Sequence, residues 1–291
     1  AIGFIEKNKD GPFFLYLPYC IPHAELTVPQ DSMEPYLKLG WKEKPKIAGT
    51  GNTGGGGYGS QYKGGYCGQS HPLATYAGMI SRMDRNIGKI LDLLDELKLS
   101  ENTLVIFSSD NGPWLSYETH AGTPGLLRHG KGTTFEGGMR VPGIFWWPGT
   151  IEPGVTQEIG SAMDLFTTAI ALAGGQVPDD RPIDGVDLSA VLFDEGPSPR
   201  DVMAYYRLGE LYAFRQGRYK VHFVTEGRYG LPPERTDHDT PLLYDLDQDP
   251  SERFDVEAER PEAFDAVVAA AERYRANMTF AEPLFDLRGG S

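Results

Sequence analysis

Cysteine is scarce in this sequence, because its 291 residues contain only Cys20 and Cys67. Two cysteines in a chain of this length give no disulfide framework. The sequence also lacks any run of 18 apolar residues, so no membrane span is indicated. What remains is a chain with 40% hydrophobic and 23% charged residues, a composition typical of a protein with a buried core rather than a disordered one.

Basic residues are fewer than acidic residues. The chain has 27 lysine and arginine residues against 41 aspartate and glutamate residues, and its formal net charge is −14 at pH 7. This balance argues against nucleic acid or an anionic membrane surface as a partner. An anionic ligand can still bind such a protein, but only through a local cluster of positive groups or a metal ion.

The N-terminus has neither a start methionine nor a signal peptide. Its first residues, "AIGFIEKNKDGPFFLYL", predict the end of an amphipathic helix, a Lys-Asp-Gly turn and a buried strand at residues 13–17. A strand this apolar normally lies inside a sheet that already has neighbours. We therefore expect the sequence to begin in the middle of a domain, or an upstream portion to have been removed.

Helical periodicity alternates with short apolar runs over much of the chain. The expected elements are a helix at residues 73–97, strands at 104–107 and 141–147, and a helix in "SAMDLFTTAIALAGG" that stops at Gly174 and Gly175. Strands that alternate with helices indicate an α/β domain with a largely parallel sheet. We assign this domain to residues 1–195.

A different pattern begins near residue 196. The stretch "LYAFRQGRYKVHF" predicts a hairpin around Gln216 and Gly217, and residues 260–276 predict a helix. Residues 196–291 are therefore expected to form a small antiparallel sheet with a helix packed on it. A glycine-rich stretch at residues 45–72 indicates a surface loop or lid, although a flexible insertion without function is at least as good an interpretation.

Two polar segments follow predicted strands, where ligands bind in open α/β sheets. In the first, "SSDNG", Asp110 and Asn111 offer a carboxylate and an amide oxygen, which hard cations such as Ca²⁺ or Mg²⁺ prefer. Taken alone, this segment is better explained as a simple turn than as a metal site. It therefore predicts a metal site only if other features support one.

The second segment, "LLRHGKGTTFEGGMRVP", places four basic or imidazole side chains among glycines: Arg128, His129, Lys131 and Arg140. A lysine is a compact charge suited to anionic oxygens, and glycine lets a backbone approach closely. Taken alone, a solvated basic loop is the more common explanation of this segment, and the residue order of a P-loop is absent. Within this segment we expect Arg140 to pair with Glu136.

Together these motifs resemble the type I sulfatase family. The resemblance rests on "SSDNG" followed by "GKGTTFEGGMRVP", on "PFFLYLPYCIPHAEL", and on "SAMDLFTTAIALAGG", "IDGVDLSAVL" and "LLYDLDQDPSERFDV". The C-terminal motifs are similar to those of arylsulfatase A and N-acetylgalactosamine-6-sulfatase. The resemblance implies an alkaline-phosphatase-like sulfatase fold, a mostly parallel sheet flanked by helices, with a small C-terminal antiparallel sheet plus helix.

The segment "CIPHA" is similar to the Cys-x-Pro-x-Arg signature that sulfatases convert to formylglycine, their nucleophile. Ala24 stands where that signature needs arginine, and Cys67 has no proline two residues further on. The resemblance therefore implies that neither cysteine is the nucleophile and that formylglycine lies upstream of this chain. We expect Cys20 to be a small buried hydrophobe instead.

The resemblance also implies roles for individual residues. Asp110 and Asn111 would hold Ca²⁺, or alternatively Mg²⁺, and Lys131 would contact the sulfate and the leaving oxygen. His23 would protonate the leaving alkoxide, a task that suits a histidine. His129 would line the substrate pocket beside them.

The implied function is hydrolysis of sulfate esters, with an aryl sulfate or a sulfated glycan as substrate. Two alternatives remain open: a phosphomonoester or phosphonate hydrolase of the same superfamily, and a non-catalytic, sulfatase-like carbohydrate-binding module. The expected location is periplasmic or secreted, or lysosomal in a eukaryote. Without the upstream portion, we expect the 291 residues to be inactive and poorly stable.

Overall fold

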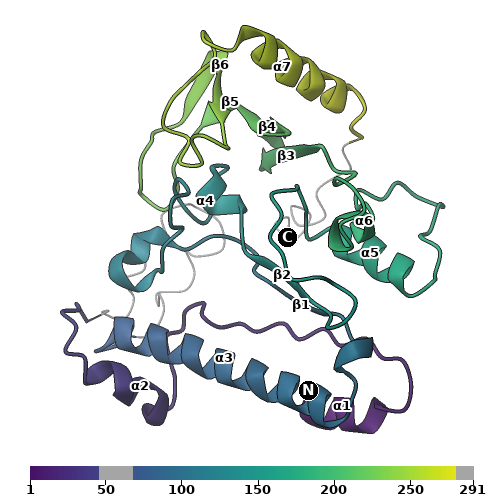
Figure 1. Cartoon of the computed structure of the whole chain (residues 1–291). Helices are drawn as coiled ribbons and strands as arrows, with labels where there is room; N and C mark the ends of the chain where they lie inside the picture. Colours follow the sequence, from purple (N-terminus) through teal and green to yellow (C-terminus); the bar gives the residue numbers. More distant parts are fainter. Residues whose placement is uncertain (46–67, 280–291) are drawn as a thin grey trace, which may run out of the picture.

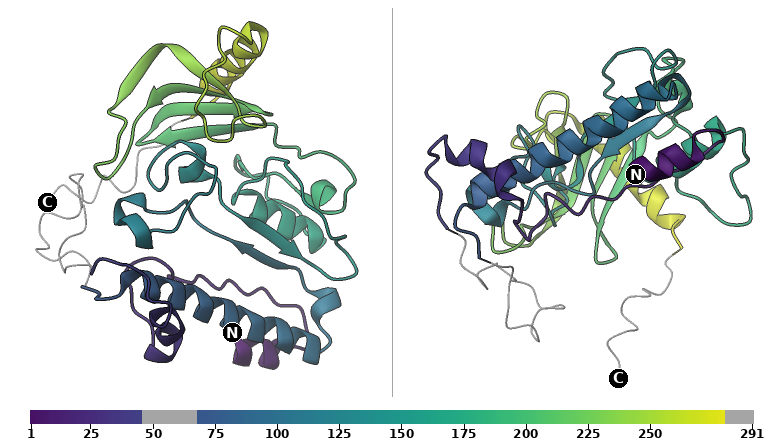
Figure 2. Two further views of the ribbon diagram at one scale, coloured as in Figure 1. Left: turned by 60° about the vertical axis from the view of Figure 1, so that its left-hand side comes forward. Right: turned by 90° about the horizontal axis from the view of Figure 1, so that it is seen from below.

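Two separate sheets organise the chain in this computed structural model, which describes residues 1–45 and 68–279 (Figure 1). A two-stranded sheet, β1-β2, lies between the long helix α3 and a four-stranded sheet, β3-β4-β5-β6, which carries the last helix. In the left view of Figure 2 the long helix near the N-terminus and the last helix lie at opposite ends of the molecule. The glycine-rich stretch and Cys67 fall largely or wholly outside the described residues.

Three helices make up the layer at the N-terminal end: α1 (Ile2–Asn8), α2 (Gln30–Leu37) and α3 (Pro72–Glu96). The predicted helix at 73–97 is α3, whose buried side chains include Ala74, Met79 and Leu94. The carboxylate of Glu43 accepts hydrogen bonds from the first amides of α3, at 2.6 Å from Leu73 N. This bond satisfies donors that a helix start leaves without a partner. Among the described residues, no helix has the length and apolarity needed to cross a bilayer.

The strand expected at residues 13–17 is not formed. The segment is extended but carries no strand pairing, and Phe14 and Tyr16 are 79% and 76% exposed. Apolar composition favours a strand only when a neighbour can accept its backbone hydrogen bonds, and the described residues offer none here. Cys20, at the end of this segment, is exposed, so the expectation that it is a buried hydrophobe is wrong.

The two strands predicted at 104–107 and 141–147 are β1 (Val105–Ser108) and β2 (Gly143–Trp146). They pair antiparallel, with Val105 opposite Trp146, although we expected a largely parallel sheet. The chain between them forms η2 (Leu115–His120) and α4 (Glu136–Met139) and returns without the crossover helix that a parallel pair needs. The short helix η1 (Ser100–Asn102) connects α3 to β1.

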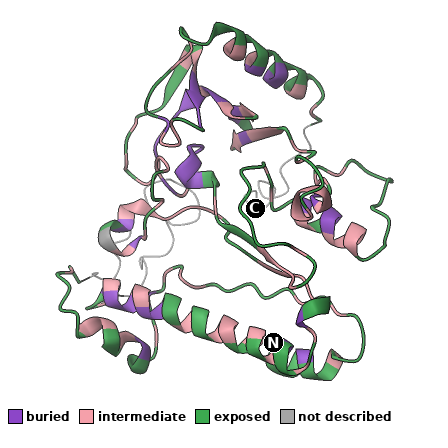
Figure 3. Cartoon of the chain, in the orientation of Figure 1, coloured by how far each residue is buried: buried purple, intermediate pink, exposed green. Residues whose placement is uncertain are grey.

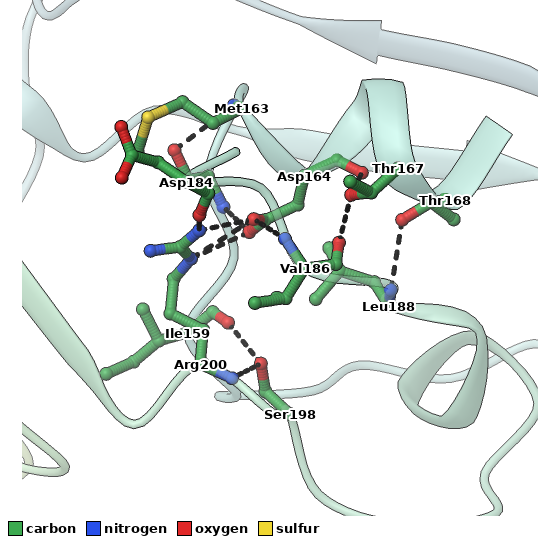
Figure 4. A network of polar contacts seen from close by, with 11 residues as sticks. Ile159, Met163, Asp164, Thr167, Thr168, Asp184, Val186, Leu188, Ser198 and Arg200 are labelled. Carbon is green, nitrogen blue, oxygen red and sulfur yellow. Dashed lines mark hydrogen bonds and ion pairs between the residues drawn. The ribbon is translucent and has the colours of Figure 1, made fainter. Parts of the chain in front are cut away.

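A buried ion pair joins the segments between the two sheets. Asp164 begins α5 (Asp164–Leu172) and is fully buried, and Arg200 donates to both of its carboxylate oxygens, at 2.5 to 3.2 Å (Figure 4). The same carboxylate accepts from the amide of Val186, which precedes α6 (Ser189–Leu192). These contacts tie the helix predicted in "SAMDLFTTAIALAGG" to the start of the C-terminal sheet.

The C-terminal sheet is antiparallel, as predicted. Its strands are β3 (Val202–Arg207), β4 (Glu210–Gln216), β5 (Tyr219–Thr225) and β6 (Thr236–Asp245), and α7 (Pro261–Ala276) packs on one face. Phe214 and Val221 lie in the core beneath α7, which approaches closely through Ala270 and Ala271. Because side chains alternate along a strand, Lys220 and His222 lie on the opposite face, toward α4. The boundary at residue 195 stays a prediction.

Candidate active site

Two loops that are distant in sequence meet at the carboxyl end of β1. The amide of Gly112 donates to the carbonyl of Gly138 at 3.1 Å, and Lys131 N donates to Pro113 O at 2.9 Å. A Cβ on Gly112 would lie 1.7 Å from the carbonyl oxygen of Gly137, so only glycine fits this contact. The turn that holds Asp110 and Asn111 is thus fixed against the loop that holds Lys131.

Lys131 and His23 contact each other directly. Lys131 Nζ lies 3.0 Å from His23 Nε2, although the two residues are 108 positions apart. His23 Nδ1 lies 2.6 Å from the carbonyl oxygen of Ala24, which can only accept, so we assign the ring hydrogen to Nδ1. In the neutral ring Nε2 then carries the lone pair, and the Lys131 ammonium donates to it. His23 is exposed and Lys131 is half-buried, so a ligand can reach both.

An aromatic cluster borders this pair. The ring centroid of Trp114 lies 5.1 Å from Lys131 Nζ, 5.8 Å from the His23 ring and 4.8 Å from the Tyr229 ring. Tyr117 packs edge-on against Trp114 at 4.7 Å. The pair formed by Lys131 and His23 is therefore walled on one side by aromatic rings.

The C-terminal part of the chain reaches the site through the loop between β5 and β6. Gly132 has a φ of +86°, and a Cβ there would lie 2.6 Å from Arg228 Cγ and 3.0 Å from Tyr229 Cε2. The loop thus packs on the residue that follows Lys131. Sequence reasoning did not assign Tyr229 or Trp114 to the site. Trp114 directly follows "DNGP" and could have been found, whereas Tyr229 has no local signal.

His129 anchors this same loop. Its Nε2 contacts the carbonyl oxygen of Pro232, and its ring stacks on Phe135 with centroids 5.6 Å apart. The predicted role of His129 in substrate binding stays a prediction, because the contacts found here are with the protein. His71 Nδ1 lies 3.3 Å from Glu43 Oε1 at the start of α3.

A buried charged network lies behind the Lys131 loop. Lys220 is fully buried, and its Nζ lies 2.9 Å from Glu136 Oε1, 2.9 Å from Glu252 Oε1 and 2.8 Å from the carbonyl oxygen of Thr134. Glu252 also accepts from the amide of Glu136 at 2.6 Å and contacts His222 Nε2 at 2.7 Å. The network fastens the "TTFEGG" segment to the C-terminal sheet.

The expected pairing of Arg140 with Glu136 is wrong. Arg140 donates to Gln157 Oε1 at 3.0 Å, while Glu136 faces Lys220 and, at 3.8 Å, Arg215. Glu136 lies at the start of α4 and is buried, whereas Arg140 follows α4 and is exposed. The two ends of this short helix therefore point into different surroundings.

The network shifts several protonation equilibria. Burial alone would lower the pKa of Lys220, but the charges of Glu136 and Glu252 outweigh burial and raise that pKa above its ordinary value. Burial would raise the pKa of Glu252, yet Lys220 and His222 lower it to about 2. The pKa of His222 is lowered, mainly by burial, so its ring is neutral at pH 7. Lys220 and Glu252 are thus held charged away from water.

Only part of a cation site is provided by the described residues. Asp110 is exposed, and Asn111 Nδ2 donates to Gly112 O at 2.9 Å, which leaves the amide oxygen to face a cation. These two oxygens are of the kind that Ca²⁺ and Mg²⁺ prefer, but such ions take six or more oxygen ligands. Within residues 1–45 and 68–279, no three acidic, histidine or cysteine side chains are grouped as metal ligands. The donors fit in type and remain incomplete in number.

Comparison with known proteins gives two family matches. The family model described as "Sulfatase" matches residues 1–175, and that described as "C-terminal region of aryl-sulfatase" matches residues 198–288. Arylsulfatase A of Bos taurus is 40% identical over 210 residues, which cover 66% of this chain and 41% of the bovine protein. N-acetylgalactosamine-6-sulfatase of Canis lupus familiaris is 41% identical over 277 residues, which cover 87% of this chain and 46% of the canine protein. The resemblance to these enzymes is confirmed.

Solved structures agree on the fold. The structure of Ps i-CgsB in complex with k-i-k-neocarrahexaose superposes with a TM-score of 0.70 at 28% sequence identity, covering 94% of this chain and 52% of that one. The predicted α/β sulfatase fold class is therefore confirmed. The chain spans about half the length of the curated relatives it matches.

Proposed function

Because the chain belongs to the sulfatase family, we propose that the polypeptide carrying this sequence hydrolyses sulfate esters at the site around Lys131 and His23. One observation carries the proposal, the 3.0 Å contact between Lys131 Nζ and His23 Nε2. It joins a fixed positive charge to a group that can hold or release a proton. Both are needed to cleave an anionic ester whose leaving group is an alkoxide.

Lys131 acts on the charge of the ester. Its ammonium donates hydrogen bonds to a sulfate oxygen and to the bridging oxygen, on which charge grows as the sulfur–oxygen bond breaks. Its backbone amide is bonded to Pro113 O, so the side chain begins from a fixed point. A donor that is oriented in advance does not have to reorganise during the reaction, and each such donor is worth about 3 kcal/mol.

His23 supplies the proton to the leaving oxygen. Its Nδ1 hydrogen is bonded to Ala24 O, which directs Nε2 toward Lys131 and the ester. For this step Nε2 must itself carry the proton that the alkoxide receives. The proton then moves from Nε2 to the departing alkoxide.

The remaining chemistry needs groups that these residues do not provide. We propose that Asp110 and Asn111 contribute two oxygen ligands to a Ca²⁺ ion, or alternatively Mg²⁺. When bound, the ion would neutralise negative charge on the sulfate group. We place the formylglycine nucleophile outside these 291 residues, because neither cysteine has the proline and arginine context of the signature.

We propose a sulfated carbohydrate as the substrate. The names of relatives support this choice: one is an N-acetylgalactosamine-6-sulfatase, and a solved structure with the same fold is a complex with k-i-k-neocarrahexaose. The aromatic wall beside Lys131 also supports it, since sugar rings and aryl groups both pack on aromatic side chains. An aryl sulfate is therefore the convenient assay substrate.

The test compares two esters that share one leaving group. The polypeptide that carries this sequence, purified with its metal, is given 4-nitrophenyl sulfate and 4-nitrophenyl phosphate in parallel. We expect faster release of 4-nitrophenol from the sulfate. A preference for the phosphate would indicate a phosphomonoester hydrolase, and no release from either ester would indicate a non-catalytic binding module.

A further inference from the structure

We infer that Trp114 and Tyr229 form a subsite that binds the sugar ring of the substrate, so that the C-terminal part of the chain takes part in substrate recognition. This inference rests on the proposed function, because it places the sulfate of that sugar at Lys131. The two rings come from different parts of the chain, one following β1 and one following β5. Their centroids lie 4.8 Å apart with an interplanar angle of 50°, so they form a corner rather than a stack.

The position of the corner matches the reach of a sulfate ester. In such an ester only the bridging oxygen, and for a 6-sulfate also the exocyclic C6, separates the sulfur from the sugar ring. A sulfate held by Lys131 therefore brings its sugar ring to the distance of the Trp114 ring, whose centroid is 5.1 Å from Lys131 Nζ. The His23 ring also lies near Trp114, at 5.8 Å between ring centroids, and its contact with Lys131 places it next to the bridging oxygen.

Both rings keep surface for a ligand. Trp114 and Tyr229 are half-buried, while Tyr117 behind them is 9% exposed and supports the Trp114 ring edge-on. An aromatic ring with a polar tip offers a pyranose an apolar face and a hydrogen-bonding group together. This combination suits a sugar, whose ring has a C–H face and a hydroxyl edge.

Tyr229 is held in place before any ligand arrives. Its loop is closed by a hydrogen bond from Gly227 N to Pro233 O at 2.8 Å. Arg207 on β3 forms an ion pair at 2.7 Å with Glu226, and His129 contacts Pro232 O. A loop fixed at both ends loses little conformational entropy on binding, which favours recognition by a preformed surface.

The subsite is tested by separating the sugar from the sulfate. Tyr229→Ala, Tyr229→Phe and, as a matched control, Phe254→Ala are made in the polypeptide that carries this sequence; Phe254 is 63% exposed and lies outside the site. The probes are galactose 6-sulfate, N-acetylgalactosamine 6-sulfate and inorganic sulfate as an inhibitor. For the better sugar ester, we expect Tyr229→Ala to raise KM about tenfold with little change in kcat. Tyr229→Phe, which keeps the ring and loses the hydroxyl, should raise KM less, and Phe254→Ala should leave KM unchanged.

Inorganic sulfate has no ring, so its inhibition constant should be the same in Tyr229→Ala and wild type. An equal rise in that constant would overturn the inference, because Tyr229 would then act only by packing on Gly132 beside Lys131. An unchanged KM in Tyr229→Ala would also overturn it. Trp114→Leu, which keeps an apolar side chain of useful volume, repeats the test if Tyr229→Ala does not fold.

The subsite can fail separately from the proposed function. If the wild type releases sulfate from no ester, the proposed function fails, and the subsite is measured by binding instead. Saturation-transfer NMR with unsulfated N-acetylgalactosamine then reports contact with the ring protons. We expect transfer to the sugar in wild type and Tyr229→Phe and its loss in Tyr229→Ala, and equal transfer in all three would overturn the subsite.

Discussion

The sheet β3–β6 and the segment at residues 12–20 differ in how far their aromatic side chains are buried. Phe214 on β4 is fully buried beneath α7, whereas Phe14 is 79% exposed. Figure 3 shows the strands of the sheet mostly as buried or intermediate and the extended segment after α1 mostly as exposed. Even the charged groups behind the sheet are buried and paired, as Lys220 is with Glu136 and Glu252. The sheet thus has partners for its apolar and polar groups elsewhere in the described chain, whereas Phe14 remains largely exposed.

The strand pair β1-β2 belongs to the second kind. Ile144 on β2 is 54% exposed and Phe107 on β1 is 36% exposed. Two paired strands without further cover are of marginal stability in water. The loops with Asp110 and Lys131 connect the ends of these strands. The position of the candidate site therefore depends on the buried network of Lys220, which fixes the Lys131 loop to the C-terminal sheet. Four predictions measure this contrast, beginning with the largest effect.

Removing the charge at the centre of the network should cost the most. Lys220→Met leaves Glu136 and Glu252 buried without a cation, and we expect the free energy of unfolding to fall by about 3–5 kcal/mol. Denaturant titration measures this change, with Lys89→Met on the exposed face of α3 as the matched control. A loss equal to that of the control would show that the network is not a structural centre.

The same truncation placed in the two regions should give unequal results. Phe214→Ala removes a ring from a packed core, and we expect a loss of about 3 kcal/mol or more. Phe14→Ala removes a ring that makes little contact within the described residues, so its effect should stay within about 0.5 kcal/mol. If both variants lose the same free energy of unfolding, Phe14 is buried in the protein, and the proposed difference between the two regions is wrong.

Acid should weaken the C-terminal region in two stages. As pH falls below about 6.5, the unfolded chain binds a proton at His222 more readily than the folded chain, where the pKa is lowered, so stability decreases. Between pH 4.5 and about 2 the same holds for Glu252. At high pH the sign reverses: the raised pKa of Lys220 supplies stability that is lost only as pH rises through and above 10.5.

The melting temperature recorded from pH 2 to 11 checks this profile. We expect a plateau between about pH 6.5 and 10.5 with a decline on both sides. In His222→Gln the decline that begins near pH 6.5 should disappear, while the loss below pH 4.5 remains. A wild-type profile that is flat from pH 4.5 to 6.5 would contradict the assignment of a buried neutral His222.

The smallest effect on folding is expected at the proposed cation ligands, because Asp110 is exposed. Asp110→Asn should leave the free energy of unfolding of the metal-free protein unchanged but lower the divalent metal bound per polypeptide. Elemental analysis after dialysis measures the metal, with Asp92→Asn on α3 as the control. Unchanged metal content in Asp110→Asn would show that "SSDNG" is a turn without a role in metal binding.

Local periodicity predicted the elements whose partners are close in sequence. The long helix α3, the hairpin of β4 and β5 and the helix α7 all follow from apolar spacing and a glycine at the turn. The predicted strand at 13–17 was wrong because apolar composition indicates only that a segment favours burial. A strand also needs a neighbouring strand that accepts and donates its backbone hydrogen bonds. The antiparallel pairing of β1 with β2 depends on how the chain returns, which no single segment encodes.

The site was predictable only in part, for the same reason. His23, Asp110, Asn111 and Lys131 stand in recognisable motifs, and the structure places His23 against Lys131. The partner of Glu136 was missed because Lys220 is 84 positions away, in a strand with no polar motif. Tyr229 was missed for the same reason. Contacts between distant segments depend on the fold and leave no local pattern.

The central claim is that Lys131 and His23 act together on a sulfate ester, and one variant tests it most directly. Lys131→Ala, in the polypeptide that carries this sequence, is assayed for sulfate release from 4-nitrophenyl sulfate beside Lys89→Ala and wild type. We expect kcat to fall about 100- to 1,000-fold in Lys131→Ala, with an unchanged denaturation midpoint, and to stay at the wild-type value in Lys89→Ala. A folded Lys131→Ala that turns over the ester at the wild-type rate would contradict the account.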